Sequence, residues 1–346
     1  MSQTLGTLEE LPAEYRQAMT DAGVAPLWPM MRNVLPHGQP QPVSKAHLWA
    51  FDAIRPLLLE AGELTPVEKA ERRVLVLSDP GRGNGAMQAT ASIYVGLQLL
   101  LPGETAPAHR HTPSAARVIV EGKGGYTVVG GEKLPMDDGD LVLTPTGEWH
   151  DHGHEGTEPV IWLDALDLPL YYYLEGSYAI EGPLQAQRNR PDASQVEYQA
   201  AGLTPTRRLG QPAPRFPLLR FPWSRTEKAL NDLAAFGGAE SVEMDYVNPE
   251  TGGDLLPTLG FTALMLRPGE KLSPSLSSAS AVFHVVKGKG TTKVNGEAFS
   301  WGPKDTFSVP VFAEIDHTGG DEPAYLIQVH DRPLQKKLDY YEERPR

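Results

Sequence analysis

Two stretches of this chain carry the same series of turn landmarks in the same order, and this duplication limits the fold more than any other feature of the sequence. The second copy follows the first by 166 residues at the early landmarks and by 165 at the later one. The pairs are Pro102–Glu104 with Pro268–Glu270, Glu121–Gly124 with Lys287–Gly290, and Thr144–Pro145 with Val309–Pro310. A repeat of this length indicates two copies of one structural unit.

Each copy has the pattern of a set of short β-strands. Gly and Pro make up about 19% of the 346 residues, where ~12% is usual, and they separate short runs that are rich in β-branched residues. In the first copy these runs are Ile93–Leu101, Arg117–Val120, Tyr126–Val129, Leu141–Thr144 and Val160–Leu166. Short strands with turns at this spacing favour an antiparallel sandwich or barrel, so we predict a mainly β protein.

The segments outside the two copies have helical patterns. We predict helices over residues 12–22, 49–61 and 227–236, and a further short helix that begins with a capping box made by Thr65 and Glu68. The predicted division of the chain is a helical segment over 1–75, a first β-domain over 76–187, a connection over 188–258, and a second β-domain with the tail over 259–346.

The acidic balance of the chain argues against a polyanionic partner. With 44 acidic and 31 basic side chains the formal net charge is −13, so we expect no nucleic-acid or membrane surface. The absence of cysteine excludes disulfides and thiolate metal sites. We expect a cytoplasmic protein, because no secretory signal is apparent and a mainly apolar stretch such as Leu97–Leu101 is far shorter than the ~20 residues of a membrane span.

Three histidines of the first copy have the spacing of a metal site. His109 and His111 are two positions apart, so on a strand their side chains point to the same face. A strand that returns alongside could place His150 opposite them. Three imidazoles suit iron, copper, nickel or zinc and leave coordination positions open, as a catalytic site requires. The alternative is a histidine-rich surface loop, because His152 and His154 follow closely.

The residues around these histidines resemble the two sequence motifs of the cupin superfamily, over residues 102–150. A typical cupin also has a glutamate ligand four or five residues after the second histidine, where this chain has Ala115 and Ala116. A metal here would therefore have three neutral ligands and keep its full charge. Such an ion favours an anionic bidentate ligand, for example a carboxylate with an ortho phenolate.

A closer resemblance is to bacterial gentisate 1,2-dioxygenases and to their relatives that cleave salicylate or 1-hydroxy-2-naphthoate. It rests on Tyr94–Glu104, Ala106–Thr112, His150–Gly153, Trp162–Asp164 and Tyr246–Pro249. The resemblance implies an Fe(II)-dependent bicupin that forms a homo-oligomer, in this family typically a tetramer. It also implies that His109, His111 and His150 are the iron ligands, and that a small aromatic acid, gentisate, is cleaved by O₂ to maleylpyruvate.

The same family resemblance implies that Arg72, Gln98, Arg117, His152 and Asp164 line a substrate pocket. We expect catalytic roles for Arg117, His152 and Asp164, and substrate contacts from Arg72, Tyr94, Gln98, Arg117, Trp149 and Asp164. The sequence does not say which of the adjacent Arg72 and Arg73 faces the pocket, and the other would have a solvated role at a helix end. Asp164 shares strand parity with Trp162, whereas Asp167 has no comparable support.

Several of these residues also have an ordinary structural explanation. Arg117 lies in an apolar run where an unpaired charge would be costly. It therefore needs either an anionic substrate or a salt bridge, for which Glu104 and Glu121 are the candidates. Tyr94 and Gln98 could simply belong to a half-buried strand face.

The second copy lacks the metal-ligand positions. At the observed offsets, the residues that correspond to His109, His111, Arg117 and His150 are Ser275, Ser277, Phe283 and Ile315. We therefore expect one iron per chain and a structural second domain.

Other functions stay open at this point. Salicylate and 1-hydroxy-2-naphthoate share the chelating groups of gentisate, although Tyr94 resembles the gentisate group more than the salicylate-cleaving relative, which carries tryptophan there. A non-catalytic ligand-binding bicupin is a rival of another class. A cupin isomerase using zinc or manganese is a further rival, but it would normally keep the carboxylate ligand that is missing at Ala115 and Ala116.

Overall fold

The computed structural model describes residues 5–83, 85–182, 190–200, 202–206, 215–237 and 241–346. The chain forms two compact units, which divide between Val43 and Ser44. The first unit contains α1 (Ala13–Asp21), the 3₁₀ turn η1 (Trp28–Met30) and α2 (Met31–Val34), and these helices bury no residue. The position of α1 confirms the helix predicted over residues 12–22.

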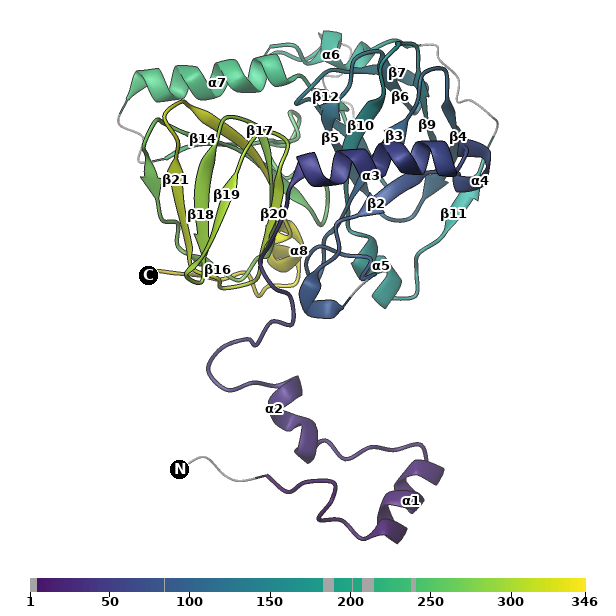
Figure 1. Ribbon diagram of the computed structural model, residues 1–346, viewed down its shortest axis with the longest axis vertical. Coiled ribbons are helices and arrows are strands. Elements are labelled where there is room, and N and C mark those ends of the chain that lie inside the picture. The colour runs from purple at the N-terminus through teal and green to yellow at the C-terminus, as the bar shows by residue number, and fades with distance from the viewer. Residues whose placement is uncertain (1–4, 84, 183–189, 201, 207–214, 238–240) are drawn as a thin grey trace. The chain divides into compact units, whose positions relative to one another are not determined.

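The second unit contains two β-barrels, each made of a larger and a smaller antiparallel sheet (Figure 1). The first barrel has the larger sheet β12-β8-β5-β10-β3-β2 and the smaller sheet β11-β4-β9-β6-β7. Its strands are β2 (Arg73–Val76), β3 (Tyr94–Leu100), β4 (Thr105–His111), β5 (Ala115–Glu121), β6 (Gly125–Val129), β7 (Glu132–Met136), β8 (Leu141–Thr144), β9 (His150–His154), β10 (Val160–Leu166), β11 (Ala179–Glu181) and β12 (Arg220–Phe221).

The second barrel repeats this topology. Its larger sheet is β1-β20-β17-β22-β14-β13, its smaller sheet is β15-β21-β18-β19, and β16 pairs with β23. The strands are β1 (His47–Trp49), β13 (Val242–Asp245), β14 (Gly260–Leu266), β15 (Lys271–Leu272), β16 (Leu276–Ser277), β17 (Ala281–Lys287), β18 (Gly290–Val294), β19 (Glu297–Trp301), β20 (Thr306–Val309), β21 (Ile315–Gly319), β22 (Ala324–His330) and β23 (Glu343–Arg344). The order β8-β5-β10-β3 matches β20-β17-β22-β14 strand for strand, which confirms the predicted duplication.

The segment between the two barrels contributes an edge strand to each of them. Strand β12 pairs with β8 of the first barrel, and β13 pairs with β14 of the second. Between these strands lies α7 (Trp223–Phe236), which packs against β13 and β14 and crosses the end of the second barrel in Figure 1. Helix α7 begins one turn before the predicted residue 227. The short helix α6 (Ala193–Glu197) precedes β12.

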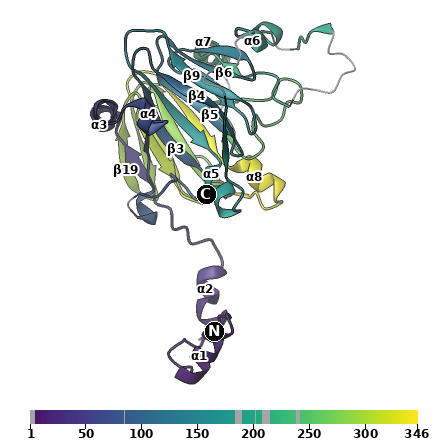
Figure 2. The ribbon, with the colours of Figure 1, turned by 90° about the vertical axis from the view of Figure 1, so that its right-hand side faces the viewer.

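Helix α3 (Phe51–Leu64) precedes the first barrel in the chain and packs against the outside of β2 and β3 (Figure 2). It buries Phe51, Leu58 and Gly62, which share one helical face because they are seven and four residues apart. A Cβ at Gly62 would lie 3.0 Å from Leu99 Cδ2, so glycine permits the close approach to β3. None of the helices in the described ranges is long and apolar enough to cross a membrane.

The predicted capping box is wrong. Helix α4 (Val67–Ala70) has Pro66 as its N-cap and no side-chain capping hydrogen bond. Thr65 instead ends the preceding helix, where its extended backbone is the C-cap of α3. The sequence pattern therefore predicts the start of a helix correctly. Thr65 does not cap that helix, because the connection is short and Thr65 is already the C-cap of α3.

Each barrel ends in an aspartate that is bonded to a hydroxyl from the other barrel. Asp167 lies before α5 (Leu168–Tyr173) and accepts from Thr258 Oγ1 and, at 2.7 Å, from the Ser114 amide. Asp331 lies before α8 (Arg332–Lys337) and accepts from Ser92 Oγ and, at 2.9 Å, from the Ser280 amide. The two contacts are related by the duplication, and α5 and α8 lie next to each other in both ribbon views.

Candidate metal centre

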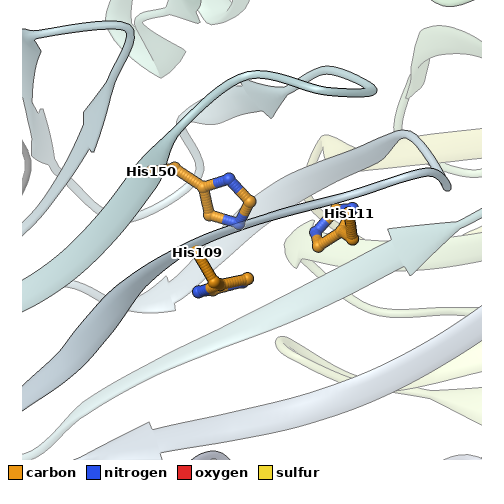
Figure 3. A group of neighbouring side chains, drawn as sticks. All are labelled: His109, His111 and His150. Atoms are coloured by element: carbon orange, nitrogen blue, oxygen red, sulfur yellow. The ribbon is translucent and has the colours of Figure 1, made fainter. Parts of the chain in front are cut away.

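Strands β4 and β9 bring the three predicted histidines together. His109 and His150 are directly opposite in the β4–β9 pairing, and a bulge in β4 lies just before His109. His111 follows two positions later, on the same face. One ring nitrogen from each residue lies within 4.8 Å of the others, and Figure 3 shows the three imidazoles converging from the two strands. The sequence-based expectation that a returning strand places His150 opposite the pair is therefore confirmed.

Backbone carbonyls orient all three imidazoles. Each ring places Nδ1 against a carbonyl oxygen two residues away in the chain, at 3.0 Å for His109, 2.6 Å for His111 and 2.9 Å for His150. A carbonyl can only accept, so Nδ1 carries the proton and Nε2 has a free lone pair. The His150 Nε2 is buried and has no hydrogen-bond partner in the described part of the chain.

Burial keeps these histidines neutral. Burial, together with the nearby charges of Arg72 and Arg117, lowers the pKa of His109 to about 3 and that of His111 to about 4. The pKa of His150 is also far below its ordinary value, mainly through burial. Three neutral nitrogen donors with free lone pairs are the form of histidine that binds a metal.

The residues present fit a divalent metal ion. The group contains three histidines and no carboxylate from the described residues. Ala115 and Ala116, which occupy the positions of the usual cupin glutamate, are both buried alanines of β5. An unpartnered nitrogen inside the barrel is otherwise a cost of about 1–3 kcal/mol, which coordination would remove.

A buried ion pair lies beside the histidines. Arg117 on β5 is opposite Asp164 on β10, and its Nε is 2.9 Å from Asp164 Oδ1. The Trp162 indole donates to the other carboxylate oxygen at 2.9 Å. Arg117 is 3% exposed and Asp164 6%. The Nη1 of Arg117 has no hydrogen-bond partner within the described ranges.

The salt-bridge partners proposed for Arg117 from the sequence are wrong. Glu104 pairs with Arg73, and Glu121 pairs at 3.0 Å with Arg55 and at 2.9 Å with Lys304. The partner is Asp164, which lies far along the chain but next to Arg117 in the sheet.

The two adjacent arginines, Arg72 and Arg73, have different surroundings in the structure. Arg73 is 4% exposed, forms the ion pair with Glu104, and donates at 3.0 Å to the Gly62 carbonyl at the end of α3. Arg72 is half-buried, and its charge lowers the pKa values of His109 and His111. Arg72 is therefore the arginine whose charge reaches the histidine cluster, and Arg73 links helix α3 to the barrel.

His152 lies on the same face of β9 as His150. Its ring centroid is 5.6 Å from that of His150 and 6.4 Å from that of His109. Its Nδ1 is 2.9 Å from Thr127 Oγ1, and its Nε2 is buried without a partner in the described chain. Burial holds the pKa of His152 far below its usual value. Thr127 was missed from the sequence, although the duplication signals it, because Thr292 and His317 repeat the pair at an offset of 165.

Tyr94 and Gln98 lie on the β3 strand next to this group. Gly96 is opposite Asp164 in the β3–β10 pairing. A Cβ at Gly96 would be 2.5 Å from Val74 Cγ1 and 2.8 Å from the Tyr94 hydroxyl, so the tyrosine lies over this glycine. Gln98 is 2% exposed, and its Nε2 has no hydrogen-bond partner among the described residues.

Trp149 is not brought to the group. Its ring lies 5.0 Å below the Arg110 guanidinium and fills the space beside Gly182. Arg110 points to the face of β4 opposite His109 and His111, because side chains alternate along a strand. Trp149 therefore lies on the outer side of the smaller sheet.

Comparisons with known proteins agree with this architecture. A cupin domain family model matches residues 96–166. A gentisate 1,2-dioxygenase from Ralstonia sp. is 48% identical over 99% of this chain and 97% of its own length. A 5-aminosalicylate 1,2-dioxygenase from Comamonas sp. is 39% identical over 94% of this chain and 88% of its own length.

The likeness extends to solved structures. The crystal structure of salicylate 1,2-dioxygenase from Pseudoaminobacter salicylatoxidans with gentisate has a TM-score of 0.90 and 29% identity, and the match covers 99% of this chain and 96% of that one. Together with the cupin match, this confirms the predicted mainly β bicupin fold.

Proposed function

This chain belongs to the gentisate 1,2-dioxygenase family, and we propose that it cleaves the ring of gentisate (2,5-dihydroxybenzoate) with O₂ at an Fe(II) ion, giving maleylpyruvate. One observation supports this most. Three neutral imidazoles converge without a carboxylate, next to a buried arginine that has a free N–H. His109, His111 and His150 would hold the ion. A bound Fe(II) ion would supply positions for the aromatic acid and for O₂ and would let electrons pass between them.

The neutral ligand set favours a dianionic chelating substrate. Three imidazoles leave the 2+ charge of the ion uncompensated, and a carboxylate with an ortho phenolate supplies two negative oxygens at chelating distance. All acids of the salicylate type have this pair of groups. The chelation therefore selects the substrate class, and the surrounding side chains select among its members.

We propose that Arg117 and Arg72 bind the negatively charged group of the substrate or the bound oxygen. Arg117 is fixed by Asp164 through Nε, which leaves Nη1 free to donate. Arg72 has no ion-pair partner at 4 Å or less among the described residues, and its charge reaches the cluster. Asp164 thus acts on the substrate through the arginine that it positions.

His152 is the group that we assign to proton transfer. Thr127 Oγ1 lies 3.4 Å from Met136 Sδ, which can only accept a hydrogen bond. If the threonine donates to this sulfur, the Nδ1–H of His152 donates to the threonine, and Nε2 presents a lone pair. A neutral imidazole with a free Nε2 can take the proton from a substrate hydroxyl.

Tyr94, Gln98 and Gly96 are the residues that we assign to the choice of ring. Gentisate has a 5-hydroxyl that salicylate lacks, and a site built to hydrogen-bond a hydroxyl discriminates strongly against analogues without it. The Tyr94 hydroxyl and the unpartnered Gln98 amide are the available polar groups on β3. We expect kcat/KM for gentisate to exceed that for salicylate or 1-hydroxy-2-naphthoate by at least about tenfold, or ~1.4 kcal/mol.

A second candidate substrate is 5-aminosalicylate, since the Comamonas relative named for it is 39% identical to this chain. Its amino group occupies the position of the gentisate 5-hydroxyl and also enriches the ring. We further propose that the protein is cytoplasmic and assembles as a homo-oligomer, a tetramer by resemblance to the family.

The test is an assay of the anaerobically Fe(II)-loaded protein with each acid, in which O₂ uptake and ring-opened product are measured together. Gentisate should give one O₂ per product. Arg117→Ala should lose far more activity than Arg110→Ala, the matched control, because Arg110 stacks on Trp149 on the outer face. Equal losses would remove Arg117 from the site. A protein that binds the acids without O₂ uptake would be a ligand-binding bicupin, and zinc- or manganese-dependent isomerisation would make it an isomerase.

A further inference from the structure

The second barrel encloses a cavity at the position that corresponds to the metal centre of the first. Its volume is about 250 Å³, equal to about eight water molecules at ~30 Å³ each, which is room for a single small ring with one substituent. Ser277 and Ile315 line it at the positions of His111 and His150. The cavity thus persists where the metal ligands have been replaced.

The inner wall of this cavity is apolar. Phe283 takes the position of Arg117 and is stacked on Phe307, with ring centroids 5.0 Å apart. Opposite Phe283 in the pairing of β17 with β22 lies Gln328, where the first barrel has Asp164. A neutral pair has therefore replaced the buried ion pair. Leu264 completes this wall.

His317 contributes a hydrogen-bond donor to the cavity. Its Nδ1 is 2.8 Å from Thr292 Oγ1, and the Trp301 indole N–H donates to the same oxygen at 2.9 Å. Because the indole can only donate, the threonine hydroxyl is satisfied by donating to Nδ1, which leaves the His317 proton on Nε2. The first barrel has Met136 at the position of Trp301 and lacks this donor. The substitution therefore makes the second histidine a donor.

His330 and Arg332 supply further donors on the opposite side. Arg332 Nη2 donates at 2.8 Å to His330 Nε2, so the neutral ring carries its proton on Nδ1. His330 is 4% exposed and lines the cavity, and its Nδ1 has no hydrogen-bond partner in the described chain. The Arg332 guanidinium is half-buried and lines the cavity, where it also donates to Thr262 Oγ1 at 3.5 Å and forms a long ion pair with Asp245 at 3.8 Å.

We propose that this cavity is a second binding site, for a small aromatic monocarboxylate, with the ring against Phe283 and the carboxylate on Arg332 and the histidine donors. The His330 Nδ1–H, which is buried and has no acceptor in the described chain, and the His317 Nε2–H favour an anionic group beside the positive charge of Arg332. Burying such a donor unpaired would otherwise be costly. The exposed Glu243 and Glu343 at the mouth disfavour a second negative charge on the ligand. The site needs no metal and does not depend on the reaction proposed for the first barrel.

The test uses 4-bromobenzoate, which lacks the ortho hydroxyl needed to chelate iron. Crystals of the Fe(II)-loaded full chain are soaked under anaerobic conditions, and the anomalous signal of bromine separates the two barrels by position. Binding in solution is measured by calorimetry. Arg332→Gln removes the charge, and Gln328→Trp fills the cavity with an indole. Arg267→Gln is the matched control, since it removes a charge from the same barrel outside the cavity, where Arg267 pairs with Glu270 at 2.8 Å.

We expect a bromine peak in the second barrel, an affinity at least tenfold weaker in Arg332→Gln, and no peak there in Gln328→Trp. Arg267→Gln should bind as the wild type does. Circular dichroism and thermal unfolding establish whether each variant is folded. If one of the two cavity variants does not fold, the other is sufficient for the test. The absence of a second-barrel peak in the wild type, or unchanged binding in a folded cavity variant, would overturn the proposal.

Discussion

The buried pair of Arg117 and Asp164 gives the sharpest prediction for stability. Replacing Asp164 with Asn keeps the shape of the side chain but removes the only charge of opposite sign within 4 Å of Arg117 among the described residues. Both side chains are more than nine-tenths buried, so solvent cannot take the place of the lost partner. Breaking a pair of this kind costs about 3–5 kcal/mol. We therefore expect Asp164→Asn to lower the free energy of unfolding by that amount.

The second barrel indicates how the same position is filled without charge. Phe283 and Gln328 occupy the corresponding paired positions. A double variant, Arg117→Phe with Asp164→Gln, should therefore regain most of the stability lost in Asp164→Asn, because replacing a buried pair by uncharged groups is often neutral or stabilising. It should have no dioxygenase activity, since the free arginine N–H is gone.

Urea unfolding of the wild type, Asp164→Asn and the double variant, followed by fluorescence, measures both effects. The change in midpoint with an unchanged slope gives the stability difference. The reasoning is refuted if Asp164→Asn costs less than about 1 kcal/mol, which is the scale of an exposed ion pair, or if the double variant is no more stable than the single one.

Three further predictions concern the rest of the site and the second barrel. Asp167→Asn should weaken metal affinity more than Asp331→Asn, its counterpart, because Asp167 holds the loop whose carbonyl orients His111; equal metal affinities by equilibrium dialysis would disprove this. Gly96→Ala should reduce kcat/KM for gentisate at least about tenfold in steady-state assays, since the new methyl would meet a neighbour at 2.5 Å and misplacing a pocket group slows catalysis strongly; unchanged kinetics would contradict it. Burial lowers the pKa of His284 to about 3. The unfolded chain therefore takes up a proton at this histidine below about pH 6.5, while the folded chain does not. The free energy of unfolding should fall as the pH drops from 6.5 towards 3, at up to ~1.4 kcal/mol per pH unit. His284→Gln should show a shallower fall in urea titrations, and an equal slope would exclude this histidine as the cause.

The sequence predicts the metal centre well because two local rules suffice for it. Side chains of His109 and His111 share a face through the two-residue period of a strand, and a returning strand supplies His150. The duplication, in turn, predicts the two barrels, because its landmarks recur at turns with the same spacing.

The sequence does not predict the pocket equally well. The contacts in the pocket depend on which strands are neighbours in the sheet and on the face to which each side chain points. The partner of Arg117 is Asp164, which is adjacent only once β10 lies beside β5. Trp149 is next to His150 in the chain, yet the strand period directs it to the outer face. Strand β1 was missed altogether, since its pairing with β20 involves residues about 260 apart in sequence.

The most direct test of the central claim is a titration of metal-free protein with Fe(II) under anaerobic conditions, in which bound iron and initial gentisate turnover are measured on the same sample. One three-histidine site per chain predicts that activity rises in proportion to bound iron and stops at one iron per chain. His150→Ala should bind no iron tightly and show no turnover. Activity that continues to rise to two irons per chain, or full activity without iron, would contradict the account.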